Sequence, residues 1–307
     1  MPLPWLWIVF TLVAAFSQSV RNILQRSLTA TLGTIGATHV RFLYGLPFGL
    51  VFLAVVLVAT GVRMPVPTIA VLGWTGFGAL TQIAATALML AAMQQKSVVV
   101  VTAYIKTEPV LVAVFGLALL GDPVTITLVA AILIATAGVL LMTWPRAGMG
   151  EIFAVRPALY GLGAAGLFGL SAVGFRGAII GVASGNFVAD ASIVLVLALA
   201  LQTIVLTAWL ALREPKTLVA IAKAWRQSLA AGFTGAFASQ AWFLAFAVES
   251  AARVRTLALV EILFAQVLAG RFLREHAGPR EWIGIAAAAL GVVLPLNGGS
   301  WAVPSPG

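Results

Sequence analysis

The sequence contains no cysteine and has few charged residues. Without cysteine, a disulfide framework and cysteine-ligated zinc or iron–sulfur sites are excluded. Lys, Arg, Asp and Glu make up 9% of the 307 residues, whereas a typical soluble protein carries about 25%. So few charges cannot cover the surface of a soluble fold of this size. The sequence therefore indicates a protein whose outer surface faces lipid.

Long apolar runs account for most of the chain. Hydrophobic residues make up 62% of it, and the mean hydropathy is +1.08. Charge-free windows such as 1–20, 42–62 and 64–95 reach or exceed the roughly 20 residues that a helix needs to cross a bilayer. Residues 1–20 lack the basic start and the cleavage site of a signal peptide, so we expect a retained first helix. Division at Gly, Pro, Asn and Asp turn signals predicts ten spans, at residues 4–28, 34–59, 68–93, 98–120, 125–144, 158–182, 187–212, 228–248, 252–272 and 281–298.

The net charge of +9 does not indicate nucleic-acid binding, because the bases lie singly or in small groups between apolar runs. Their distribution instead predicts orientation, since Lys and Arg favour cytoplasmic connections. Twelve bases in odd-numbered connections against three in even-numbered ones predict both termini outside the plasma (inner) membrane. The odd connections hold Arg21, Arg26, Lys96, Arg146, Arg156, Arg213, Lys216, Lys223, Arg226, Arg271, Arg274 and Arg280, and the even ones hold Arg63, Arg253 and Arg255.

The chain matches itself when it is shifted by 153 residues. The shift places Glu108 on Glu261, Asp122 on Glu275, and Gly138 on Gly291. We interpret this as a duplication with repeats at residues 1–152 and 153–307. Five helices per repeat is an odd number, so the second repeat enters the membrane from the opposite side. Inverted repeats are typical of transporters that expose one midplane site alternately to either side.

The repeated segments resemble a known family. Residues 97–121 with Glu108-Pro109, then Asp122, Thr125 and Gly138-Val139, are similar to the EamA-type repeat of the drug/metabolite transporter superfamily; the second copy carries Glu261, Glu275, Gly284 and Gly291. The resemblance covers essentially the whole chain. It implies an all-α membrane protein with ten transmembrane helices, as two inverted five-helix repeats around a central cavity. It also implies an exporter or exchanger of small metabolites, among which amino acids, including aromatic ones, are transported by similar proteins.

Ionisable residues inside the predicted spans are candidate functional residues, because a charge at mid-bilayer costs about 3 kcal/mol on insertion scales. Glu108 and Glu261 lie about ten residues into spans four and nine. Each could bind an amine or exchange a proton during transport, or it could pair with a neighbouring helix and join the two halves. Pro109 predicts either a kink or a break that exposes a backbone ligand.

Further candidates for substrate contact flank these acids. Tyr104 stands one turn before Glu108 and is expected on its helix face, while Lys106 could neutralise a substrate carboxylate or pair with an acid. Uncharged polar side chains in spans three and eight are expected to face protein or cavity, and an aromatic neighbour could form a cavity wall or pack in the core. These residues are Gln82, Gln240 and Trp242. For Arg41 and Arg176 we expect snorkelling to the interface.

The preferred functional hypothesis is a secondary transporter that exports amino acids or similar metabolites by alternating access. The alternatives are a channel or scaffold, or an exporter of drugs, sugars or nucleotide metabolites. Metalloprotease, P-loop and hydrolase motifs are missing from the sequence. We therefore expect that the protein is not an enzyme, that it binds no metal or cofactor, and that it has no ATPase subunit. The expected partners are a small-molecule substrate and the bilayer, with the chain as monomer or homodimer. Residues 213–227 have apolar and basic faces typical of a surface helix.

Overall fold

The computed structural model describes residues 5–95, 101, 104–143, 155–261 and 279–297, and these residues form helices and connections without strands. This agrees with the predicted all-α class. The helices are α1 (Leu6–Leu43), α2 (Gly45–Thr60), α3 (Ile69–Gln95), α5 (Glu108–Leu120), α6 (Ile126–Thr143), α7 (Val155–Val182), α8 (Phe187–Arg213), α9 (Pro215–Lys223), α10 (Trp225–Val248), α11 (Ala251–Leu257) and α13 (Pro279–Asn297).

Most helices follow the predicted spans closely, and one difference lies near the N-terminus. Span one and the start of span two form the single element α1, which breaks at Gly33 with φ 67° and ψ 178°. Glycine tolerates this conformation because it has no Cβ. A second interruption at Tyr44 separates α1 from α2. Of span nine, only residues up to Glu261 are described; residues 262–272 and Glu275, which the duplication matched to Asp122, lie outside the described residues.

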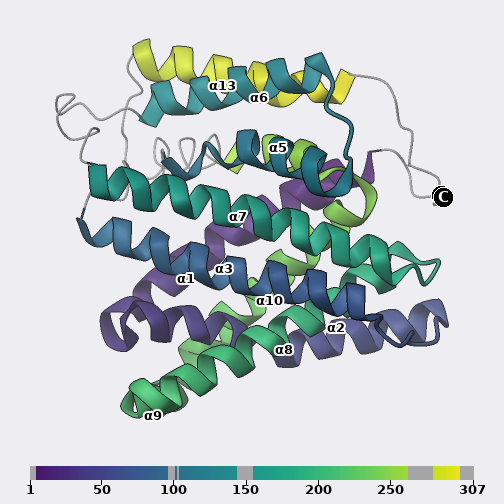
Figure 1. The fold of residues 1–307 in the computed structure, drawn as a ribbon. Helices are drawn as coiled ribbons and strands as arrows, with labels where there is room; N and C mark the ends of the chain where they lie inside the picture. Colours follow the sequence, from purple (N-terminus) through teal and green to yellow (C-terminus); the bar gives the residue numbers. More distant parts are fainter. Residues whose placement is uncertain (1–4, 96–100, 102–103, 144–154, 262–278, 298–307) are drawn as a thin grey trace.

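The pairing of helices reflects the duplication. In Figure 1, α6 and α13 lie side by side as the uppermost layer, and the other helices lie below them. The helix α3 packs along α7, and α1 packs along α10. Adding 153 to the residue numbers of α3 gives those of α10, and subtracting 153 from those of α7 gives residues of α1. The pair α3–α7 is therefore equivalent to the pair α10–α1. The helices therefore associate as two copies of one five-helix plan.

Two glycines show this equivalence at atomic detail. A Cβ built at Gly138 in α6 would overlap the backbone nitrogen of Ala288 in α13, and one built at Gly291 would overlap that of Ala135. Gly291 lies 153 positions after Gly138, and Ala288 lies 153 positions after Ala135, so the two contacts are equivalent under the duplication. Small residues let helix backbones approach closely. The last helices of the two repeats thus meet at a reciprocal close crossing.

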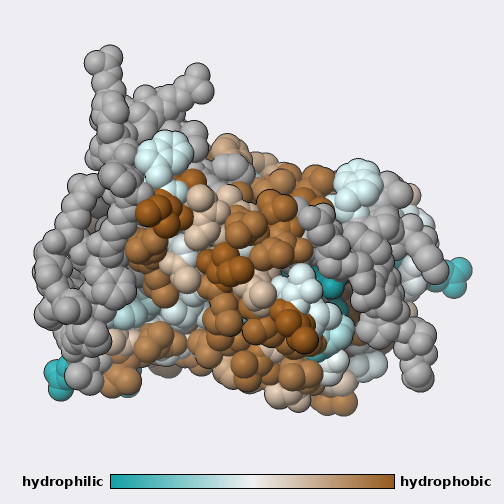
Figure 2. Space-filling model, turned by 90° about the horizontal axis from the view of Figure 1, so that it is seen from above, coloured by the Kyte–Doolittle hydropathy of each residue, from teal (hydrophilic) through white to brown (hydrophobic). Residues whose placement is uncertain are grey.

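The outer surface is apolar across the middle of the molecule. Figure 2 shows hydrophobic surface over the centre of one face, with hydrophilic atoms at its two ends. Large apolar side chains point outward from several helices, with Val58, Ile69 and Ile126 at least 86% exposed. Soluble proteins rarely expose such continuous apolar surface. Five helical segments of the described chain are long and apolar enough to cross a membrane: Leu28–Thr60, Ile69–Met89, Ala158–Val182, Phe187–Arg213 and Trp225–Val248.

The predicted surface helix is present as α9. Ile221 is buried against the rest of the protein, whereas Lys216 and Lys223 are exposed. Trp225, within the segment 213–227 predicted as one surface helix, does not belong to α9. It is the first residue of α10, is exposed, and lies beside the guanidinium of Arg226. The short helix therefore has one packed face and one basic face, as the charge pattern predicted.

Candidate functional site

The helix of span four is interrupted immediately before Glu108. The carbonyl of Tyr104 accepts hydrogen bonds from the backbone nitrogen of Thr107 (3.1 Å) and from its hydroxyl (2.7 Å), which closes a tight turn. A new helix, α5, then begins at Glu108 with Pro109 in its first turn. Proline fits there because its missing N–H needs no helical acceptor. Of the two possibilities for Pro109, the structure shows the break, and Glu108 lies at the start of a helix rather than ten residues into one.

A similar interruption precedes Glu261 in the second repeat. The helix α11 ends at Leu257, and the backbone nitrogen of Leu259 donates to the carbonyl of Thr256 at 3.2 Å. The nitrogen of Glu261 then donates to the carbonyl of Ala258 at 3.0 Å. The residue after Glu261 is Ile262 rather than proline, so proline is not required for this break. Both repeats present their acid directly after a helix break.

The two acids form ion pairs that cross between the repeats. The Lys106 ammonium of the first repeat lies 3.1 Å from a carboxylate oxygen of Glu261 in the second. The Arg255 Nε of the second repeat lies 3.2 Å from a carboxylate oxygen of Glu108 in the first. These four side chains are 13–17% exposed, so they lie inside the fold but remain accessible. The arrangement joins the halves, as the architectural interpretation of the acids predicted.

The first helix adds polar groups to Glu261. The hydroxyl of Ser19 donates to one carboxylate oxygen at 3.4 Å, and the amide of Gln18 donates to the other at 3.5 Å. The amide oxygen of Gln18 accepts a hydrogen bond from the indole nitrogen of Trp242 at 3.1 Å. The helix α1 and the turn before α5 therefore contact this carboxylate directly, and α10 is joined to it through Gln18.

Trp242 is buried and packs beside the ion pairs. The guanidinium carbon of Arg255 lies 4.6 Å from the centre of the indole ring and 5.4 Å from the ring of Phe246. Arginine over an aromatic face is stabilised by cation–π attraction. Trp242, Lys106, Glu108 and Glu261 are the predicted site residues that the structure brings together at this centre, and we name it the crossed-pair site.

The other three predicted site residues contact neighbouring helices. The amide of Gln82 accepts a 2.7 Å hydrogen bond from Gln202 of α8, and the amide of Gln240 donates to Ser192 of α8 at 3.0 Å. Tyr104 packs on Gly161 of α7, where an added Cβ would lie 2.7 Å from that of the tyrosine. The helix break also separates Tyr104 from Glu108. Their role in substrate binding stays a prediction.

Two arginines that we assigned to the interface lie inside the fold. Arg21, which the charge count placed in a connection, is a buried residue of α1. Arg41 was expected to snorkel but packs beside it against α10. A Cβ built at Gly235 would be 3.1 Å from Cγ of Arg41 and 3.5 Å from Cδ of Arg21. The sequence could have indicated this position for Arg21, because Gln18 and Arg21 are three residues apart and share one face of α1. The apolar composition of the surrounding residues makes this polar face hard to recognise.

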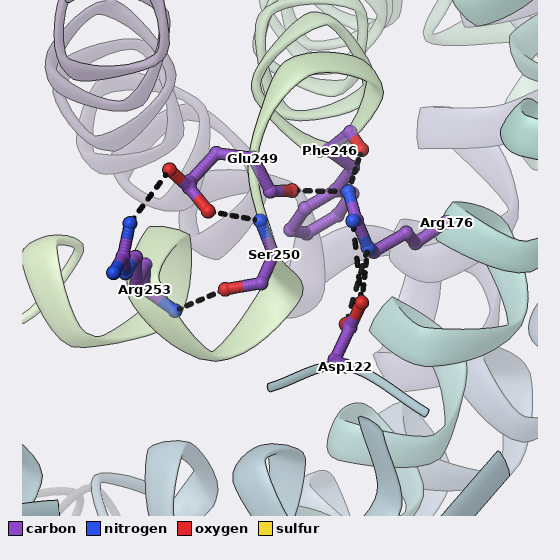
Figure 3. A network of polar contacts seen from close by, with 6 residues as sticks. All are labelled: Asp122, Arg176, Phe246, Glu249, Ser250 and Arg253. Atoms are coloured by element: carbon purple, nitrogen blue, oxygen red, sulfur yellow. Dashed lines mark hydrogen bonds and ion pairs between the residues drawn. The ribbon is translucent and has the colours of Figure 1, made fainter. Parts of the chain in front are cut away.

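Arg176 is likewise not at an interface. It donates from Nε and Nη2 to the carboxylate of Asp122 at 3.2–3.4 Å, as Figure 3 shows. Its Nη1 donates to the carbonyls of Phe246 and Glu249, where α10 ends. The side chain is 8% exposed. The snorkelling prediction is therefore wrong, because a carboxylate and two carbonyls within the fold satisfy this cation.

The same figure shows how the start of α11 is held near Arg176. The carboxylate of Glu249 accepts from the backbone nitrogen of Ser250 at 2.7 Å and pairs with Arg253 at 3.2 Å. The hydroxyl of Ser250 accepts from the backbone nitrogen of Arg253 and caps α11. Asp122 belongs to the first repeat and all these partners to the second, so the network joins the halves at a second place.

Comparisons with known proteins agree with this architecture. The family model described as "EamA-like transporter family" matches the chain twice, over residues 5–144 and 157–296. A solved structure described as "Crystal structure of protein" is similar with a TM-score of 0.69 and 17% sequence identity, covering 94% of this chain and 96% of that chain. At this identity the likeness concerns the fold alone. No curated protein gives a significant match.

Proposed function

The chain belongs to the EamA-like transporter family, and on this premise we propose that it exports or exchanges amino acids, aromatic ones included, by alternating access. The family indicates a multi-pass membrane transporter of small molecules. The finer proposal depends on the crossed-pair site, where charged groups of both repeats meet beside Trp242. Such a site can contact the charged backbone groups and the ring of an amino acid together.

The crossed ion pairs support alternating access because each of them ends on a different repeat. When the halves move relative to each other, Lys106–Glu261 and Glu108–Arg255 must lengthen or exchange partners. Each acid follows a helix break. The backbone can bend at such a break while the helical hydrogen bonds on either side stay intact. We propose Glu108, Tyr104, Lys106, Gln82, Gln240, Trp242 and Glu261 as the residues that contact substrate during the cycle.

The plasma membrane is the proposed location, and we propose that proton or potential gradients drive export. Two carboxylates and several bases inside an apolar fold can carry charge or exchange a proton as the site changes its access. Flux into proteoliposomes should therefore change with an imposed pH gradient or with a potassium–valinomycin potential. Flux that is the same with and without both gradients would reject this drive.

Counterflow of labelled amino acids into proteoliposomes tests the function itself. Vesicles containing the protein and unlabelled phenylalanine are expected to accumulate external labelled phenylalanine transiently and saturably, unlike vesicles without protein. Flux that does not saturate would instead identify a channel, chemical change of the solute an enzyme, and inert vesicles a scaffold. A panel of sugars, nucleotide metabolites and toxic amphiphiles in the same assay separates the alternative substrates.

The variant Glu108→Gln tests the site within this assay. It removes the charge but keeps the shape, so we expect transport per folded molecule to fall at least tenfold, with a smaller loss of thermal stability in detergent. A collapse of stability with unchanged transport per folded molecule would show that the acid is only architectural.

A further inference from the structure

The described residues around the crossed-pair site carry more positive than negative charge. Lys106 and Arg255 are paired with the two acids. The charges of Arg21 and Arg255 also act on Arg41, and that of Arg21 acts on Glu261. Arg41 is therefore a base of this region for which the described residues supply no carboxylate, while Lys106 and Arg255 already pair with Glu261 and Glu108. Two other described acids, Asp122 and Glu249, pair with arginines elsewhere. An unbalanced positive charge inside an apolar fold favours an anionic ligand.

The donors of Arg41 are incompletely used. Its guanidinium has one recorded hydrogen bond among the described residues, from Nη2 to the hydroxyl of Ser239 at 3.5 Å, and its Nε has none. An arginine presents five N–H donors in a planar fork. Among the described residues, no carboxylate lies within 4.0 Å of Arg41. Unsatisfied donors in an apolar interior are costly, and an oxyanion would satisfy them.

The neighbours of Arg41 are arranged along one face of α10. Gly235, Ser239, Trp242 and Phe246 follow at helical spacing, and their contacts run in order from Arg41 to Arg255. Because Gly235 lacks a side chain, both Arg41 and Arg21 can lie against the helix there. An oxyanion at Arg41 would therefore have a second guanidinium beside it and an aromatic surface further along the same face.

We propose that Arg41, with Arg21 and Ser239, forms a subsite that binds the carboxylate of the transported solute. This inference rests on the proposed transport function and names the group that the carrier requires. A carboxylate accepts two parallel hydrogen bonds from a guanidinium, which is the strongest geometry available to it. Because both acids already have partners, an amine on the solute is dispensable. Carboxylates with an apolar or aromatic body are the substrate class.

Thermal stabilisation of the purified protein by three related probes tests this requirement. The probes are phenylalanine, 3-phenylpropanoate, which lacks the amine, and phenylalaninamide, which lacks the carboxylate. Both carboxylates should raise the melting temperature in detergent, with half-maximal concentrations at least tenfold lower than the amide. Equal effects of amide and carboxylates, or no effect of either carboxylate, would overturn the proposal.

Variants identify the arginine. Arg41→Gln should raise the half-maximal concentration of both carboxylates about tenfold and leave that of the amide unchanged. Arg63→Gln, a loss of the same charge at an exposed position, should change neither. An unchanged carboxylate response in Arg41→Gln, or an equal loss in Arg63→Gln, would contradict the assignment. Arg41→Lys, which keeps the charge without the fork, should lie between wild type and Arg41→Gln and serves if the glutamine variant does not fold.

The outcomes separate this subsite from the transport function. Saturable counterflow of uncharged or cationic solutes without carboxylate binding would overturn the subsite but keep the carrier. If no solute undergoes counterflow while carboxylates still stabilise the protein through Arg41, the subsite stands and the transport proposal fails.

Discussion

Glu108 and Arg255 come from different repeats and bring a carboxylate oxygen within 3.2 Å of a guanidinium nitrogen. Lys106 and Glu261 make the reverse connection at 3.1 Å. In each pair the acid follows a helix break, and its base comes from the other half of the duplication. The two halves are thus held together by charges that neither half could satisfy alone.

The pair Glu108–Arg255 is expected to be energetically coupled. Either Glu108→Gln or Arg255→Gln leaves one buried charge without its partner, whereas the double variant removes both. The double variant should therefore be more stable than the sum of the single losses predicts, by about 0.5–3 kcal/mol. Melting temperatures of the four proteins in one detergent measure this. Additive losses would show that the two charges do not depend on each other.

The crossing of α6 and α13 should not tolerate a methyl group at Gly138. Its Cβ would overlap the backbone of Ala288, which cannot move without separating the two helices. We expect Gly138→Ala to lower stability by about 1–3 kcal/mol, measured as a drop in melting temperature. Gly73→Ala is the matched control, because a Cβ there meets nothing within 4 Å and alanine favours helix. A similar drop in both variants would contradict the crossing.

Arg176 should contribute more to stability than Arg253, although both are shown paired in Figure 3. Arg176→Gln leaves Asp122 unpaired and two carbonyls without their donor. A loss of about 3–5 kcal/mol is expected for breaking such a buried pair. Among the described residues, Arg253 pairs with Glu249 alone, and the Glu249 carboxylate also accepts a hydrogen bond from the backbone nitrogen of Ser250, so it keeps a partner when Arg253 is lost. Arg253→Gln should therefore lower the melting temperature far less; equal losses would contradict the role given to Arg176.

The lack of cysteine makes the predicted orientation directly testable. Two exposed residues can each be replaced by a single cysteine. One is Lys216, on the basic face of α9, and the other is Arg63, in the second connection. With odd-numbered connections inside, a membrane-impermeant maleimide should label Arg63→Cys in intact cells. Lys216→Cys should react only after the membrane is permeabilised. The opposite pattern would show that the chain is inserted the other way.

The helical plan could be predicted from the sequence because lipid leaves backbone polar groups few alternatives to helix. Apolar length and turn residues located the spans, and the shift that superposes Glu108 on Glu261 indicated the duplication. The break at Gly33 fell within a predicted connection. The break before Glu108 was predicted only as one of two possibilities, because a proline can kink a helix or begin a new one.

The charged site itself depended on tertiary structure. Lys106 and Glu261 are 155 residues apart in the chain, and the order of residues does not reveal which of several bases reaches which acid. Arg41 and Arg176 were predicted at the interface because a lone cation in a span is cheapest there. Helix packing instead gave Arg176 a carboxylate and two carbonyls, and it placed Arg41 beside Ser239 and Gly235. Hydrophobicity and chain length determined the helices and their number, whereas helix crossing decided which charges meet, because a side chain's partner depends on geometry that composition does not carry.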